Sequence, residues 1–161
     1  MSESTFINPS LPAAEKYLLL EEQVKALVYG EDDLIANLSN IMSALKYGMN
    51  YFWVGVYKVA GDQLILGPFQ GPVACTRIAK GRGVCGACWA KKQTIIVSNV
   101  DEFPGHIACS SATKSEIVLP IRNKKGEVAF VLDIDSTKLN DFDTGDQKGL
   151  EKVVTIIESI L

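Results

Sequence analysis

The four cysteines between positions 75 and 109 are the residues of this chain best suited to chemistry, and three of them lie near glycine, proline or the only histidine. These three are Cys75, Cys85 and Cys109, and the histidine is His106. A fourth thiol, Cys88, makes a C-x-x-C pair with Cys85. In a reducing cytosol such a cluster indicates redox chemistry or metal binding rather than structural disulfides. The sulfurs are therefore expected either to react or to coordinate a metal.

Two of the thiols have surroundings that favour a reactive thiolate. A thiolate is stabilised by a nearby cation or by the N-terminus of a helix. Cys85 follows an arginine at the start of a predicted short helix over residues 83–92, where free N–H groups favour negative charge. Cys109 lies three residues after His106 on a glycine-containing loop that is able to approach a ligand closely.

Three acidic residues occupy strand positions whose neighbours on the same face are apolar. Side chains alternate between the two faces of a strand, so Asp133 and Asp135 continue one apolar face of the predicted strand 128–135. By the same rule Glu116 shares its face with Val118. We expect the three carboxyl groups to converge where little water is available, which raises carboxyl pKa values and suits proton donation.

An aromatic wall is predicted on the strand over residues 51–59. Alternation places Trp53 and Tyr57 on one face, on either side of Gly55. Aromatic side chains in strands usually pack in a core, so this pattern alone leaves packing and ligand contact both open.

The elements that must position these residues are predicted from periodicity and turn signals. Two amphipathic helices run from Ser10 to Gly30 and from Asp32 or Asp33 to Gly48, and a third closes the chain over residues 146–161. Between them we predict strands over residues 51–59, 63–66, 73–78, 94–98, 115–121 and 128–135, and a loop over residues 99–113. Helices at both ends of a mostly antiparallel meander indicate an α+β sandwich whose long loop covers a pocket.

Length and charge narrow the functional class. A chain of 161 residues fits a single domain, residues 1–161, with a sufficient core. The net charge is -3 and the basic residues are scattered, which argues against nucleic acid as a partner. Without a basic-then-apolar leader or a long apolar run, the sequence predicts a soluble cytoplasmic protein with no membrane segment.

Several motifs resemble those of one enzyme family, the free methionine-(R)-sulfoxide reductases, which are single GAF-domain proteins. The motifs are LGPFQGPVAC at 66–75, GRGVCG at 81–86, FPGHIAC at 103–109, KSEIVLP at 114–120 and VLDIDS at 131–136. The resemblance covers nearly the whole chain. It implies a GAF-like α+β domain with a central, mostly antiparallel sheet of about six strands, terminal helices packed on one face and a loop-covered pocket on the other.

The resemblance also implies a role for each matched residue in reducing free L-methionine (R)-sulfoxide. Cys109 would attack the sulfoxide sulfur and become a sulfenic acid, Cys75 would be the main resolving partner, and Cys85 a second thiol able to form a disulfide with Cys75. Thioredoxin would reduce the disulfide, with no metal or organic cofactor, and a homodimer is implied by the family only. The implied substrate-binding residues are Glu116, Asp133 and Asp135 for the ammonium and the sulfoxide oxygen, and Trp53 and Tyr57 for the S-methyl group.

Two other functions remain open at this point. Cys85, Cys88, His106 and Cys109 have the spacing of a structural Cys₃His zinc module. Alternatively, a GAF-type domain could sense a small molecule without catalysis, since fold does not fix function. Two positions also depart from the family pattern, because Cys88 is an unexpected cysteine and Ser110 stands where an aspartate is common. The order in which Cys75 and Cys85 resolve and the identity of the proton donor also stay open.

Overall fold

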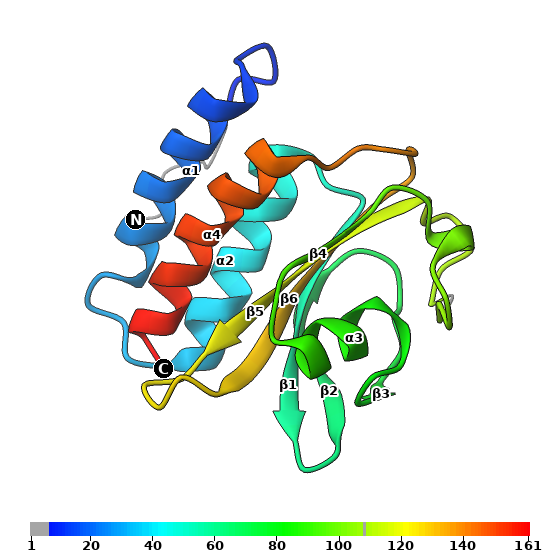
Figure 1. Ribbon diagram of the computed structural model, residues 1–161. Coiled ribbons are helices and arrows are strands. Elements are labelled where there is room, and N and C mark those ends of the chain that lie inside the picture. The colour runs from blue at the N-terminus through cyan, green and yellow to red at the C-terminus, as the bar shows by residue number, and fades with distance from the viewer. Residues whose placement is uncertain (1–6, 108) are drawn as a thin grey trace.

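The computed structural model describes residues 7–107 and 109–161 as a six-stranded sheet with helices on both faces (Figure 1). The strand order is β3-β2-β1-β6-β5-β4, and every neighbouring pair is antiparallel. The helices are α1 (Ala13–Val28), α2 (Leu34–Met49), α3 (Gly83–Lys91), the 3-10 helix η1 (Val100–Glu102) and α4 (Thr144–Ser159). The strands are β1 (Trp53–Ala60), β2 (Gln63–Gln70), β3 (Arg77–Ala79), β4 (Ile95–Val97), β5 (Ser115–Arg122) and β6 (Val128–Ser136). The predicted α+β architecture with a six-stranded antiparallel sheet is confirmed.

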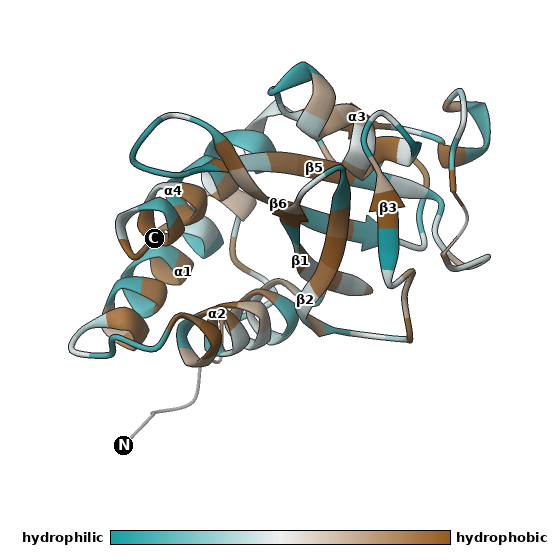
Figure 2. Ribbon diagram, turned by 90° about the horizontal axis from the view of Figure 1, so that it is seen from below, coloured by the Kyte–Doolittle hydropathy of each residue, from teal (hydrophilic) through white to brown (hydrophobic). Residues whose placement is uncertain are grey.

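The sheet separates two cores. Val54 and Val56 face the terminal helices α1, α2 and α4, and that core also receives Ile117 and Leu132. The opposite face carries Trp53, Tyr57, Val118 and Val131, and α3 packs on it. Figure 2 shows apolar colouring along much of β5 and β6, which, like β1, contribute side chains to both cores. The alternation predicted for these strands is therefore confirmed.

The helix ends follow from local capping. The Asp33 side chain accepts a hydrogen bond from the Ala36 N–H at 2.8 Å and begins α2, one of the two caps predicted there. Asp143 and Asp146 form a reciprocal capping box that begins α4. Asn50, in the left-handed conformation, ends α2.

Two details of the predicted elements are wrong. Helical periodicity predicts Leu18 and Leu19 on the apolar stripe of α1, but both are exposed, and the stripe that contacts the core consists of Tyr17, Leu20 and Val24. The strand predicted over residues 73–78 forms only at β3, so Cys75 lies in a loop. Proline lacks an N–H for strand pairing, and the Gly71-Pro72 step precedes this irregular segment. In the part of the chain that is described, no helix has the length and apolar character needed to cross a membrane.

The junction of α1 with α4 leaves no room at Gly149, which is buried against Tyr17. A Cβ at this position would lie 2.2 Å from Cγ of Tyr17, whose hydroxyl is held by Asp146 at 2.8 Å and by Tyr51 at 2.7 Å. We expect Gly149→Ala to lower the free energy of unfolding by about 2 kcal/mol, because the ring cannot move without losing these contacts. Urea denaturation measures the change. Lys148→Ala, exposed on the same helix, is the control and should change stability by less than about 0.5 kcal/mol; equal stabilities of the two variants would contradict the prediction.

Candidate active site

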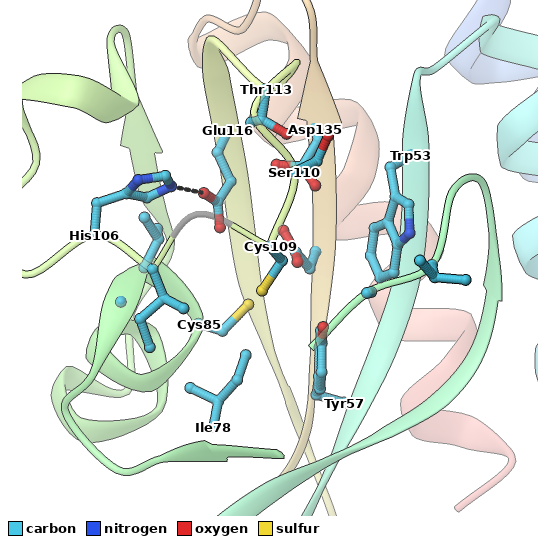
Figure 3. Close-up of a pocket in the computed structure, with 16 residues that line it drawn as sticks. Trp53, Tyr57, Ile78, Cys85, His106, Cys109, Ser110, Thr113, Glu116 and Asp135 are labelled. Carbon is cyan, nitrogen blue, oxygen red and sulfur yellow. Dashed lines mark ion pairs between the residues drawn. The ribbon is translucent and has the colours of Figure 1, made fainter. Parts of the chain in front are cut away.

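A cavity lies on the α3 side of the sheet, between the strands and the loops that precede β3 and β5 (Figure 3). Seven of the eight site residues predicted from the sequence line it: Trp53, Tyr57, Cys85, Cys109, Glu116, Asp133 and Asp135. The eighth, Cys75, is joined to Cys109 by a disulfide. The cavity thus brings together residues from β1, α3, β5, β6 and two loops.

The Cys75–Cys109 disulfide connects two loops that are 34 residues apart in the sequence, with a Cα–Cα distance of 5.4 Å. The Tyr57 hydroxyl donates a hydrogen bond to the Cys75 carbonyl oxygen at 3.1 Å, which ties the first loop to β1. Cys85 is a free thiol in the first turn of α3, and its sulfur points toward Cys109 in Figure 3. Three of the four cysteines therefore gather at one wall of the cavity.

Cys88 lies apart from this group. Its Sγ donates to the carbonyl oxygen of Val118 at 3.6 Å, and the residue is fully buried between α3, to which it belongs, and the sheet, without lining the cavity. Burial raises the pKa of the Cys88 thiol to about 12, which makes it inert. Because Cys109 is bonded to Cys75, the four residues of the zinc module considered above are not assembled in the described structure.

Strand pairing brings the three acids together. Glu116 stands opposite Asp135 in the β5–β6 ladder, and Asp133 stands opposite both Val118 on β5 and Gly55 on β1. Glu116 and Asp133 are each only 6% exposed. Oδ1 of Asp133 is buried and has no hydrogen-bond partner among the described residues. An unpartnered buried acceptor is costly, so the floor of the cavity is suited to a ligand that donates hydrogen bonds or carries positive charge.

Burial is the main cause of raised pKa values in this acid cluster. It raises the pKa of Asp133 to about 6, and contacts with Cys85 and Glu116 partly offset the rise. The pKa values of Glu116 and Asp135 rise well above their usual range, first through burial and then through the charge of Asp133. The direction expected from the sequence is confirmed, and carboxyl groups of this kind are able to donate protons near neutral pH.

The same surroundings overturn the expectation that Cys85 is a favoured thiolate. Burial, followed by the charges of Asp133 and Glu116, raises the pKa of the Cys85 thiol well above its usual value. The N-terminus of α3 does not compensate for two nearby carboxylates and the loss of water. These surroundings therefore favour the protonated thiol of Cys85 over its thiolate.

His106 is not among the site residues predicted from the sequence, yet it lines the cavity. Its Nε2 lies 4.0 Å from Oε2 of Glu116 (Figure 3). Burial lowers the pKa of His106, while that of Glu116 is raised, so both shifts disfavour an ion pair between them. Ile107 and Thr113, on the same loop, also line the cavity. The one sequence signal for this wall is that the loop carries the only histidine of the chain.

The aromatic wall depends on Gly55, whose lack of a side chain leaves room for the Trp53 ring. A Cβ there would lie 2.4 Å from the Trp53 ring, so the glycine allows that ring to fold back along β1. Trp53 stacks on Phe69 at a centroid distance of 5.4 Å and lies 6.2 Å from the ring of Tyr57. Its Nε1–H donates to the Pro72 carbonyl oxygen at 3.0 Å. Both predicted aromatics therefore contribute to a rigid apolar wall of the cavity.

The raised pKa of Asp133 predicts that stability falls as pH rises. Between the unfolded value of 3.8 and the folded value of about 6, the folded state holds a proton that the unfolded state has lost, so the stabilisation present at low pH disappears through this window. A rise of this size corresponds to about 3 kcal/mol. We expect the free energy of unfolding of the wild type to fall by about 2 to 3 kcal/mol relative to Asp133→Asn between pH 4 and pH 7.

Urea denaturation at half-unit pH intervals, with the disulfide kept intact, measures this difference. Asp32→Asn, at an exposed position, is the control and should follow the wild-type curve. A wild-type curve parallel to that of Asp133→Asn would show that the buried carboxyl carries no such proton.

Comparison with known proteins places the chain among GAF-domain proteins of similar length. The family model described as "GAF domain" matches residues 30–161. The chain is 53% identical over 146 residues to GAF domain-containing protein A of Dictyostelium discoideum, covering 90% of this chain and 92% of that protein. It is 44% identical over 149 residues to the free methionine-R-sulfoxide reductase of Escherichia coli, covering 91% and 89%.

A solved structure extends the similarity to three dimensions. The X-ray structure of the free methionine-R-sulfoxide reductase of Neisseria meningitidis in complex with its substrate superposes with a TM-score of 0.94. It is 44% identical in sequence and covers 99% of this chain and 95% of its own.

Proposed function

This chain belongs to the GAF-domain family and, within it, to the free methionine-R-sulfoxide reductases, and on that basis we propose that it reduces free L-methionine (R)-sulfoxide to L-methionine. The observation that carries the proposal is the pairing of Cys109 with Cys75 beside a cavity floored by buried carboxyl groups. A pair of thiols supplies the two electrons that the reaction requires, and the acids supply protons where oxygen is released.

The proposed reaction begins at Cys109. Its thiolate attacks the sulfoxide sulfur, the oxygen is protonated, and the S–O oxygen is transferred so that methionine leaves and Cys109 becomes a sulfenic acid. The Cys75 thiol then attacks the Cys109 sulfur and expels water, which forms the disulfide. One sulfoxide and two thiols thus give one thioether, one disulfide and one water.

The remaining residues bind and orient the substrate in this proposal. The acids Glu116, Asp133 and Asp135 hold the ammonium group and hydrogen-bond the sulfoxide oxygen, and the partnerless Oδ1 of Asp133 supports such a role. Trp53 and Tyr57 form the wall against the S-methyl group, for which their rigid, apolar surface is suited. Cys85 faces the same wall and is a second thiol able to exchange with Cys75.

Recycling completes the proposed cycle. An external dithiol must reduce the Cys75–Cys109 disulfide, and thioredoxin in a reducing cytoplasm is the reductant that we propose. The reaction needs no metal or organic cofactor, because the cysteines carry both electrons. Its benefit would be repair of the free methionine pool after oxidation.

A single-turnover assay tests the function. Prereduced protein is mixed with separated R and S epimers of free methionine sulfoxide, and methionine and free thiols are counted. We expect one methionine and the loss of two thiols per chain with the R epimer, and neither with the S epimer. If no methionine forms and all four thiols survive, the function is that of a binding domain instead.

A further inference from the structure

We propose that the floor of the cavity also binds a zinc-type divalent cation through Cys85, Glu116 and Asp133. The sulfur of Cys85 and one carboxylate oxygen from each acid lie within 4.8 Å of one another, and all three residues are buried. They come from three different elements, α3, β5 and β6. This group is the one set of metal-type donors that converges in this way within residues 7–107 and 109–161.

The backbone holds these donors in position. Pairing of β5 with β6 places Asp133 opposite Val118, two residues along from Glu116. Cys85 belongs to the buried cluster that anchors α3 on the sheet and is 3% exposed. Donor atoms around a tetrahedral zinc lie roughly 3.3 to 3.6 Å apart, given Zn–O and Zn–S lengths of about 2.0 and 2.3 Å. Side-chain rotations that move the donor atoms by about an ångström therefore bring the three donors to coordination distance.

The unpartnered oxygen of Asp133 is the second observation that points to a cation. Oδ1 of Asp133 is buried in the site and accepts no hydrogen bond from any described residue. A bound cation would supply the missing interaction and compensate for the close approach of two carboxyl groups. An ammonium group would satisfy Asp133 as well, but it gains nothing from the Cys85 sulfur. The dependence of binding on Cys85 thus separates a metal from an ammonium.

The mixed donor set selects the class of metal. Magnesium and calcium prefer six or more oxygen ligands, whereas zinc and cadmium accept a thiolate together with carboxylates. Three protein donors leave one tetrahedral position for water or for His106, whose Nε2 lies 4.0 Å from Oε2 of Glu116. A cation bound here would occupy the floor of the cavity and exclude other ligands from it.

In the disulfide form of the protein, metal binding at this site can be measured without a contribution from Cys75 or Cys109. With Cys75 and Cys109 joined, the free thiols are Cys85 and Cys88. Cys85 lines the cavity, and Cys88 is turned toward the carbonyl oxygen of Val118. Any thiolate–metal bond formed in this state is therefore assigned to one of two cysteines by single substitutions.

The experiment is titration of the oxidised wild type with cadmium, without sulfoxide, followed by the ultraviolet charge-transfer band of a thiolate–cadmium bond. Zinc affinity is measured by calorimetry on a separate, metal-free portion of the same oxidised protein. We expect one cadmium per chain with the band present. Cys85→Ser should remove the band and weaken zinc binding at least about 100-fold, and Asp133→Asn should weaken it about 10- to 100-fold. Cys88→Ser is the matched control and should bind as the wild type does.

Three results would overturn the proposal. They are the absence of stoichiometric binding up to millimolar zinc, a band that persists in Cys85→Ser, and a band that is lost in Cys88→Ser. Circular dichroism checks that each variant is folded. Should Cys85→Ser not fold, Glu116→Gln and Asp133→Asn carry the same test, and unchanged zinc affinity in both would exclude the site. Because no sulfoxide is present, failure here is independent of the proposed reductase activity.

Discussion

Cys109→Ser is expected to reduce the single-turnover rate of methionine formation at least about 10³-fold while leaving the fold intact. Loss of a nucleophile removes the covalent step itself, and effects of this size are typical of such substitutions. The sulfur of Cys109 lies at the wall of the cavity, where it also faces Cys85. The cavity lining should therefore survive the exchange of one sulfur for oxygen. Quenched-flow measurement of methionine with the prereduced variant gives the rate.

Two further cysteine variants test whether the loss of rate is specific to Cys109. Cys75→Ser should still release methionine in the first turnover but should leave a sulfenic acid, or a disulfide with Cys85, in place of the Cys75–Cys109 bond. Cys88→Ser should keep the wild-type rate, because the Cys88 thiol is hydrogen-bonded to the Val118 carbonyl oxygen and lies outside the cavity. A Cys109→Ser variant with more than a tenth of the wild-type rate would assign the attack to another group.

The parts of the site that lie on strands were predictable from the sequence. Side-chain alternation is fixed by strand geometry, so Trp53 and Tyr57, Asp133 and Asp135, and Glu116 each fall on the expected face. β5 and β6 are consecutive and pair as the predicted meander requires, whereas the pairing of β6 with β1 joins strands far apart in the sequence and was not predictable from local pattern. The convergence of the three acids needed only the further assumption that β5 and β6 pair with each other.

Properties that depend on tertiary surroundings were not predictable in this way. The sequence position of Cys85 at a helix start favours a thiolate, but burial of the thiol, followed by the charges of Asp133 and Glu116 on β6 and β5, raises its pKa instead. Likewise, C-x-x-C spacing does not reveal that Cys88 faces the sheet while Cys85 faces the cavity. Local pattern gives the face of a strand, whereas the environment of a helix residue depends on what packs against it.

The face of α1 was mispredicted for a related reason. Leu18 and Leu19 match a helical stripe as well as Tyr17 and Leu20 do, and hydrophobicity alone favours the leucines. The structure buries Tyr17 because Gly149 leaves room for its ring and Asp146 accepts a hydrogen bond from its hydroxyl. Both partners are in α4, more than a hundred residues away, so no local pattern contains this information.

Blocking the amino group of the substrate is expected to reduce kcat/KM at least about 10³-fold, in a comparison of N-acetyl methionine (R)-sulfoxide with the free amino acid. The cavity floor carries the buried carboxyl groups of Glu116 and Asp133 and the partly buried one of Asp135. Oδ1 of Asp133 has no hydrogen-bond partner among the described residues. An ammonium group meets both needs, whereas an acetamide is neutral and bulkier and leaves the acceptor unpaired. Sites built to bind a polar group reject analogues that lack it by factors of about 10⁴ to 10⁵. Steady-state assay with a dithiol reductant measures the ratio.

Asp133→Asn shows whether the acid cluster causes this discrimination. If the ammonium binds at Asp133, the substitution should lower kcat/KM for the free amino acid but hardly change it for the acetylated one, so the ratio should shrink about 10-fold or more. If the acetylated substrate is rejected only because of its bulk, Asp133→Asn should not lower kcat/KM for one substrate more than for the other. The ratio of the two kcat/KM values would then stay unchanged. Comparable turnover of the two substrates by the wild type would exclude recognition of a free ammonium, and peptide-bound sulfoxides would then be substrates as well.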